Sequence, residues 1–253
     1  MKVLVVTPTL GNRNSLLNTI RTVRDIGGES VKHIVVCPAC KVDDLSLILG
    51  VQCVSEPENN KGIYAALNYV FFTYGRQYDY LTFINDDDYW LPEFKDLIKL
   101  AERKPYLDVI YAKTLYVDAN NNVIKKQACS SQFYHFNDLF HEKVLLLTQQ
   151  TTLVRSSFFF KVGGFDETFK LVADTKFWIL ASSLKPSYKY VKKYVSCYTL
   201  QEGQLSKDGK TQAVEHDRLW HEYPSDNMIL RKLVLLWYRL SNLNVYVKRL
   251  VYK

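Results

Sequence analysis

The first half of the chain alternates short apolar runs with segments of helical periodicity, four times in succession. The apolar runs lie at residues 2–6, 32–36, 51–54 and 80–84, and the helical segments follow at 15–26, 43–49, 62–74 and 91–103. Repeated strand–helix order predicts an α/β fold with a doubly wound, mostly parallel sheet and helices on both of its faces. Such sheets bind ligands beyond the carboxyl ends of their strands, so the residues after each strand are the first candidates for a site.

The second half of the chain departs from this pattern. Two extended runs, 108–117 and 122–127, flank the turn Asp118-Ala119-Asn120-Asn121 and predict a hairpin. A strand, a helix and a further extended segment are predicted after it, at residues 151–154, 171–183 and 188–200. With 47% hydrophobic residues the chain can bury a full core, and we expect a single domain over 1–227 followed by a separate C-terminal segment, 228–253.

The positive charge of the chain is concentrated in this C-terminal segment. The formal net charge is +7, and residues 228–253 contain no acid, so the rest of the chain carries only +1. The cations of the segment are Arg231, Lys232, Arg239, Lys248, Arg249 and Lys253. A basic segment on a nearly neutral body indicates a local anionic partner and argues against nucleic acid as the ligand.

On a helical wheel the segment 228–253 is amphipathic. All its cations except Lys248 gather on one side, and the other side carries Leu233, Leu236, Trp237, Leu240, Val247 and Leu250. Asn242 and Asn244 are placed to interrupt the helix. A basic amphipathic helix predicts contact with an anionic membrane surface. The alternative is a helix docked on the domain with its charges in water.

The sequence shows no feature of a membrane-spanning or secreted chain. No apolar run approaches the length of about 20 residues that spans a bilayer, and residues 3–6 are too few for a signal peptide, so we expect a cytoplasmic protein, peripheral to the membrane if its tail binds there. Five irregularly spaced cysteines favour reduced thiols over a disulfide framework. Cys37-Pro38-Ala39-Cys40 has the spacing of a redox site, but a plain loop lining a pocket is the preferred interpretation.

Three consecutive carboxylates, Asp86, Asp87 and Asp88, directly follow the apolar run 80–84. Like charges this close repel one another unless a cation offsets them. Hard oxygen ligands suit Mg²⁺ or Mn²⁺, which usually neutralise substrate phosphates in enzymes. The pattern predicts a divalent metal site at the end of a buried strand. The alternative is a solvated acidic turn that caps the helix starting near Leu91.

Four ordered blocks of sequence include these carboxylates. They are Val3–Arg13 (VLVVTPTLGNR), Ser55–Asn68 (SEPENNKGIYAALN), Asn85–Asp88 (NDDD), and Gly163–Glu167 with Ala173–Trp178 (GGFDE, ADTKFW). Together the blocks resemble family 2 glycosyltransferases of the GT-A fold, which are inverting enzymes with nucleotide-sugar donors. The resemblance covers residues 2–205 and implies a single GT-A-like domain with an added hairpin and C-terminal helices.

The resemblance implies a metal-binding and a donor-binding set. Asp87 and Asp88 are expected to hold Mn²⁺ or Mg²⁺ against the donor diphosphate. The family pattern sets Asn85 and Asp87 at its two metal-site positions, whereas the residues alone also permit Asp86 and Asp88. The residues expected to bind the donor are Thr7, Pro8, Thr9, Arg13, Lys61, Asn68 and Asp86.

The resemblance also implies a catalytic base. Asp174 is expected to take the proton of the acceptor hydroxyl, and the alternative is a surface pair between Asp174 and Lys176. Asp166 and Glu167 follow a Gly-Gly-Phe turn and either solvate it or contact the acceptor.

These observations predict a metal-dependent inverting glycosyltransferase. It would move a sugar from a nucleotide donor, expected to be a UDP-sugar, to a saccharide or lipid-linked saccharide in surface-glycan synthesis. Residues 37–40 depart from the family, which commonly has an Asp-Gly-Ser type loop there for nucleoside contact. Two alternatives stay open: another metal-dependent enzyme of phosphorylated substrates, such as a nucleotidyltransferase, and a non-catalytic module that binds nucleotide sugars.

Overall fold

Four parallel strands and the helices that follow them form the first half of the protein. The computed structural model describes residues 1–200 and 208–251, and the side chains of residues 1–200 and 208–247. The strands are β1 (Val3–Pro8), β2 (Val31–Cys37), β3 (Gln52–Ser55) and β4 (Tyr80–Phe83), and the helices are α1 (Leu16–Gly27), α2 (Val42–Leu49), α3 (Ile63–Tyr74) and α4 (Phe94–Arg103). β1 pairs with β2 and β4, with Val3 opposite both Val31 and Tyr80. The predicted strand–helix alternation is confirmed.

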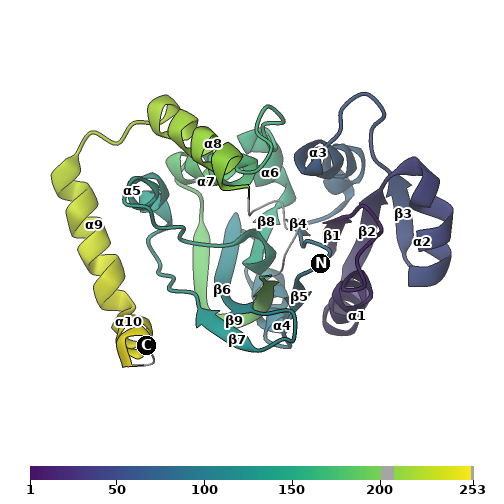
Figure 1. Cartoon of the computed structure of the whole chain (residues 1–253), viewed down its shortest axis with the longest axis horizontal. Helices are drawn as coiled ribbons and strands as arrows, with labels where there is room; N and C mark the ends of the chain where they lie inside the picture. The colour runs from purple at the N-terminus through teal and green to yellow at the C-terminus, as the bar shows by residue number, and fades with distance from the viewer. Residues whose placement is uncertain (201–207, 252–253) are drawn as a thin grey trace.

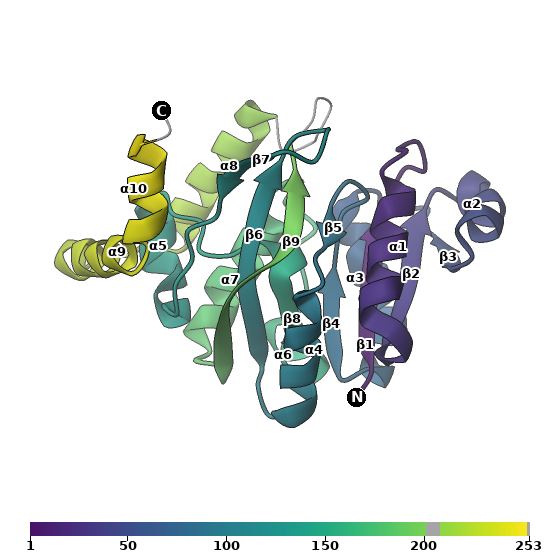
Figure 2. The ribbon, with the colours of Figure 1, turned by 90° about the horizontal axis from the view of Figure 1, so that it is seen from below.

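The second half extends the sheet with strands of both directions. These strands are β5 (Tyr89–Trp90), β6 (Val109–Val117), β7 (Val123–Lys126), β8 (Thr152–Arg155) and β9 (Tyr188–Thr199). The order across the sheet is β3-β2-β1-β4-β8-β6-β9-β5, and β7 pairs with β6 outside this path. β8 runs antiparallel to β4 and β6, whereas the long β9 is parallel to β6. Figure 2 shows these strands side by side.

The remaining helices belong to the second half. They are α5 (Phe136–His141), α6 (Ser156–Val162), α7 (Ala173–Ser183), α8 (Gly209–Glu222), α9 (Met228–Ser241) and α10 (Leu243–Val251). Short 3₁₀ helices occur at Gly28–Ser30, Ala39–Lys41, Gly75–Gln77, Phe133–His135 and Gln149–Thr151. α9 and α10 lie at one end of the molecule, and α2 lies at the other (Figure 1). No helix in the described ranges is both long and apolar enough to cross a bilayer.

Helices cover both faces of the sheet because its central strands are apolar on both sides. Successive side chains of a strand point to opposite faces. Along β1, Leu4 and Val6 therefore join the core that includes side chains of α3, α6 and α7, whereas Val3 and Val5 join the core that includes side chains of α1 and α4. An uninterrupted apolar run is the pattern expected of a strand buried in this way.

The hairpin of β6 and β7 forms at the predicted turn. Oδ1 of Asp118 accepts hydrogen bonds from the backbone N–H groups of Asn120 at 2.9 Å and Asn122 at 2.8 Å. Asn121 has a φ of 65°, in the left-handed region that asparagine tolerates better than most residues. The local chemistry of this turn is thus sufficient to explain why the chain reverses here.

Candidate active site

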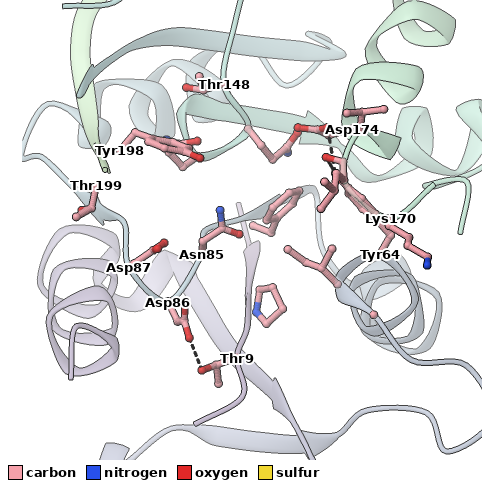
Figure 3. Close-up of a pocket in the computed structure, with 18 of the residues that line it drawn as sticks. Thr9, Tyr64, Asn85, Asp86, Asp87, Thr148, Lys170, Asp174, Tyr198 and Thr199 are labelled. Atoms are coloured by element: carbon pink, nitrogen blue, oxygen red, sulfur yellow. Dashed lines mark hydrogen bonds between the residues drawn. The ribbon is translucent and has the colours of Figure 1, made fainter. Parts of the chain in front are cut away.

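A cavity of about 1510 Å³ lies beyond the carboxyl ends of β1 and β4. Its walls come from the loops after these strands, the start of α3, the segment before β8, the loop before α7, and α8. Figure 3 shows Asn85, Asp86 and Asp87 on one side of the cavity and Tyr64 with Asp174 on the other. The position agrees with the rule that doubly wound sheets bind ligands beyond the carboxyl ends of their strands.

Two loops are joined at the carboxylate side of the cavity. The hydroxyl of Thr9, after β1, donates a hydrogen bond of 2.6 Å to Asp86, and it accepts one of 3.0 Å from the backbone N–H of Gly11. Arg13 lies 2.9 Å from a carboxylate oxygen of Asp87 and 3.4 Å from one of Asp86. Burial raises the pKa of Asp86, whereas the Thr9 hydrogen bond and the Arg13 charge oppose that shift. A cationic side chain thus offsets the two carboxylates that face the cavity.

Asp88 points away from the cavity, unlike its two neighbours. It is 1% exposed, and its Oδ1 accepts a hydrogen bond of 2.9 Å from the backbone N–H of Thr199, at the end of β9. Its carbonyl oxygen accepts a further bond of 2.6 Å from the hydroxyl of Thr19. Burial, followed by the charge of Asp87, raises the pKa of Asp88 well above its usual value. The side chain of Asp88 thus ties the loop to β9 and its carbonyl oxygen ties the loop to α1, so the prediction that Asp88 holds a metal gains no support from the geometry.

Asp174 stands on the opposite wall, in the first turn of α7. Its Oδ1 accepts hydrogen bonds from the hydroxyl of Tyr64 at 3.1 Å and from the N–H of Thr175 at 2.8 Å. Burial raises the pKa of the Asp174 carboxyl, and these two hydrogen bonds act in the opposite direction. Lys176, the alternative partner considered from the sequence, pairs instead with Asp166 at 2.7 Å and Glu222 at 3.1 Å. Asp174 is thus held by neutral donors and remains on the cavity wall.

A single carboxylate from α8 holds the loop that leads to Asp174. Glu215 accepts hydrogen bonds from three successive backbone N–H groups, those of Lys170 at 2.6 Å, Leu171 at 2.9 Å and Val172 at 3.1 Å. The carbonyl oxygen of Leu171 lies 2.9 Å from the hydroxyl of Tyr64. Glu215 was not predicted, because it lies more than forty positions along the chain from the loop it binds and no local motif marks it.

The predicted donor-binding residues divide into two groups. Five of them line the cavity, namely Pro8, Thr9, Arg13, Lys61 and Asp86, and their role in donor binding stays a prediction. Two further residues, Thr7 and Asn68, do not, and for these the structure corrects the prediction. Thr7 is fully buried in β1, where its hydroxyl lies 2.9 Å from the ring of His33. Asn68 is buried in α3 and hydrogen-bonds both the N–H and the carbonyl group of Phe165.

The acids after the Gly-Gly-Phe turn are structural in this arrangement. Asp166 pairs with Lys176, and its Oδ1 also accepts hydrogen bonds from the N–H and hydroxyl groups of Thr168. Glu167 accepts hydrogen bonds from the side-chain amides of Asn60 and Asn68. Neither acid lines the cavity, so an acceptor-contact role gains no support from the geometry.

Several cavity residues carry no recognisable sequence signal. Buried polar side chains lie on its floor just before β8, where the Thr148 hydroxyl, the side-chain oxygen of Gln149 and the side-chain nitrogen of Gln150 have no hydrogen-bond partner in the described part of the chain. From α8, His216 and Trp220 reach the cavity, and both rings pack against Phe140. Only the tertiary fold brings these segments to one place.

The cysteines form no disulfide, in agreement with the sequence-based expectation. Cys37 is buried at the end of β2, Cys40 is exposed, and neither lines the cavity. The plain-loop interpretation of residues 37–40 therefore holds, but this loop does not line the pocket. Burial raises the pKa of Cys37 to about 11, which disfavours the thiolate that redox chemistry requires.

The side chains on the carboxylate side fit a divalent metal only in part. No group of three or more His, Cys, Asp or Glu side chains within residues 1–200 and 208–247 is arranged to bind an ion by itself. Asn85 and Asp87 both line the cavity, however, and Oδ1 of Asn85 is buried without a hydrogen-bond partner among the described residues. Such hard oxygens suit Mg²⁺ or Mn²⁺ when a substrate diphosphate supplies further ligands. Oδ2 of Asp88 is likewise without a partner among these residues, but Asp88 does not line the cavity, so only the register of Asn85 and Asp87 has both members on the cavity wall.

The fold and the cavity define an α/β enzyme of the GT-A type. Residues 4–168 match the family model described as glycosyl transferase family 2. The chain therefore belongs to glycosyl transferase family 2, and it is a glycosyltransferase by family. The predicted family and fold class are confirmed. No curated protein matches the sequence closely.

Solved structures of S. aureus TarS share this fold. TarS 1–349 in complex with UDP-GlcNAc aligns with a TM-score of 0.66 at 15% identity, over 96% of this chain and 73% of that one. The complex of TarS 1–349 with UDP aligns with a TM-score of 0.61 at 16% identity, over 79% of this chain and 61% of the TarS chain. The chain spans 60% of TarS 1–349 in a third comparison and 43% of the longer TarS structure.

Proposed function

We propose that this chain is a metal-dependent, inverting glycosyltransferase that moves a sugar from a nucleotide-sugar donor to a saccharide or lipid-linked saccharide in surface-glycan synthesis. One observation carries the proposal: one cavity has Asp86 and Asp87 on one wall, with Arg13 2.9 Å from Asp87, and Asp174 on the other wall. Transfer with inversion needs a site for a leaving diphosphate on one side of the sugar and a base on the other.

A UDP-sugar is the proposed donor, bound along the loops after β1 and β4. The TarS structures of similar fold hold UDP-GlcNAc and UDP, which supports this class of donor. Pro8, Thr9 and Lys61 line the proposed donor side of the cavity, and Arg13 supplies positive charge there. Arginine binds phosphate oxygens through the planar set of N–H donors that it uses here for Asp87.

Asn85 and Asp87 are the proposed metal ligands, in place of Asp87 and Asp88. A divalent ion bound there would neutralise charge on the leaving diphosphate. The roles of the protein groups are to orient the diphosphate through Arg13 and to keep the loop in place through Asp88, whose carboxylate accepts the N–H of Thr199.

Asp174 is the proposed general base. The acceptor hydroxyl gives its proton to the Asp174 carboxylate while its oxygen bonds to the anomeric carbon, and the bond from that carbon to the diphosphate oxygen breaks. A raised pKa suits this role, because a base is most effective when its pKa lies near the working pH. Membership in family 2 favours sugar transfer over the nucleotidyltransferase alternative, which has no use for Asp174.

Replacing Asp174 by Asn tests the proposal. With a panel of UDP-sugars, the wild-type protein should release UDP in the presence of an acceptor, and D174N should be slower by about 10²- to 10⁴-fold. UDP binding by D174N, measured by calorimetry, should be unchanged. Asp217→Asn, at an exposed position on α8, is the matched control and should keep full activity. UDP binding without turnover in the wild-type protein, across all donors and acceptors, would support the non-catalytic alternative instead.

A further inference from the structure

An apolar surface faces outward on the two C-terminal helices. It consists of Leu233, Leu236, Trp237, Leu240, Leu243 and Val247, here called the C-terminal apolar face. Each of these side chains is about half exposed or more, with Trp237 at 61%. Monomeric proteins in water rarely leave so many neighbouring large apolar side chains uncovered, so the face indicates a binding surface.

The helices dock on the domain through a different face. Val234, Leu235 and Tyr238 are the buried side chains of α9, and the hydroxyl of Tyr238 donates a hydrogen bond of 2.6 Å to the carbonyl group of Ala128. Asn242, at the predicted break between α9 and α10, accepts one of 3.0 Å from the N–H of Cys129. The tail is therefore docked on the domain, as the alternative interpretation expected, but it docks through these residues, and its predicted apolar side points outward.

Positive charge borders the C-terminal apolar face. Residues 228–253 contain six Lys and Arg and no acid. Arg239 is exposed on α9, beside the apolar stripe, and one nearby acid, Glu142, is shared between Arg231 and Lys232. Two copies meeting face to face would bring these cations together, whereas an anionic surface would complement them.

We infer that α9 and α10 lie flat on an anionic lipid bilayer, with the C-terminal apolar face inserted at the boundary between headgroups and acyl chains. Aromatic and aliphatic side chains on one side, with cations beside them, are the features of a helix at a membrane surface. Arg239, exposed at the border of the face, is placed to meet lipid phosphates, whereas Lys232 pairs with Glu142. If the proposed function holds, the site would then act close to lipid-linked acceptors. Binding of the helices to the bilayer does not itself depend on glycosyltransferase activity.

Vesicle co-sedimentation of the full chain tests this inference. The wild-type protein should bind vesicles of equal parts phosphatidylcholine and phosphatidylglycerol, and bind poorly to vesicles of phosphatidylcholine alone. The double variant L236Q/W237Q should lose binding, because it removes exposed apolar area without touching the core. Leu47→Gln, an equally apolar side chain that is 87% exposed on α2 at the other end of the molecule, is the matched control and should bind normally. Arg239→Gln should weaken binding to the anionic vesicles by about fivefold.

Two outcomes would overturn the inference. One is vesicle binding that L236Q/W237Q leaves intact, or no binding by the wild-type protein. The other is a wild-type dimer in light scattering that becomes monomeric in L236Q/W237Q without any vesicle binding, because a second copy would then cover the face. An unfolding temperature of L236Q/W237Q equal to that of the wild-type protein would show that a loss of vesicle binding is not caused by misfolding of the variant.

Discussion

The hydroxyl of Tyr64, on α3, lies 3.1 Å from Oδ1 of Asp174, on α7. Tyr64 is 6% exposed, so this contact takes place largely out of water. The hydrogen bond favours the charged form of Asp174 and limits the rise in pKa that burial causes. Tyr64 thus ties the proposed base to the helix that follows the proposed donor-binding loop, and it tunes the pH range in which that base works.

Replacing Tyr64 by Phe should move the acid limb of the kcat profile to higher pH. The variant loses a hydrogen bond to the carboxylate, so the pKa of Asp174 should rise further, by about 0.7 unit for a bond of about 1 kcal/mol. Activity requires the deprotonated base and should fall earlier as the pH is lowered. Tyr69→Phe makes the same change at an exposed position of α3 and should leave the profile in place. An equal loss of activity at every pH would assign Tyr64 a purely structural role.

Replacing Glu215 by Gln should lower kcat with little change in UDP affinity. A neutral amide accepts the three N–H groups of residues 170–172 less well than a carboxylate, so the loop before Asp174 should loosen. A displacement of the base by about 1 Å is enough to reduce the rate by up to about 10²-fold. Ala at this position should be more harmful than Gln, and Asp217→Asn is the exposed control on α8. If UDP affinity falls as much as kcat, Glu215 supports the whole cavity and not the base in particular.

Replacing Asp87 by Asn should abolish the effect of Mn²⁺ on thermal stability in the presence of UDP. The wild-type protein, at a ligand concentration about 100 times Kd, should gain about 2.7 kcal/mol from the complex. Asp88→Asn should keep this gain, because Asn retains an oxygen that accepts the N–H of Thr199. Asp43→Asn, an exposed acid of α2, is the control. The reverse pattern, with D88N losing the gain and D87N keeping it, would restore Asp88 as a ligand.

His33 should make the protein sensitive to mild acid. Burial lowers its pKa from 6.5 to about 3, so between these values the unfolded chain binds a proton that the folded protein does not. The contribution of the neutral His33 to the free energy of unfolding is fully present above pH 6.5. It is lost as the pH falls towards 3, by about 1.4 kcal/mol for each pH unit. Urea unfolding at pH 7 and pH 5 should therefore differ by about 2 kcal/mol more in the wild-type protein than in H33Q. Equal differences in the two proteins would show that His33 does not titrate in this way.

The architecture could be predicted from the sequence because it rests on local patterns. The run Val3 to Val6 is buried on both faces of the sheet, and an uninterrupted apolar run predicts that arrangement. The turn at Asp118 forms through its own side chain. β5 was not predicted, since its two residues are a strand only by pairing with β9.

The site could be predicted in position but not in detail. Pro8 is the last residue of β1 and Thr9 and Arg13 follow it, so all three reach the cavity at the carboxyl end of that strand. Thr7 directly precedes Pro8, yet its side chain is buried in the sheet against His33. Glu215 and the cavity floor before β8 escaped prediction because their partners are distant in sequence.

The sequence by itself determined that a glycosyltransferase-like sheet would place acids beyond its strands, since strand periodicity and the order of motifs are local properties. Only the tertiary structure decided which acids face the cavity. Asp86, Asp87 and Asp88 are chemically identical neighbours, but contacts with Thr9, Arg13 and Thr199 hold them in different directions. The same holds for the C-terminal helices: their amphipathic pattern is visible in the sequence, but long-range bonds to Ala128 and Cys129 determine which face remains outside.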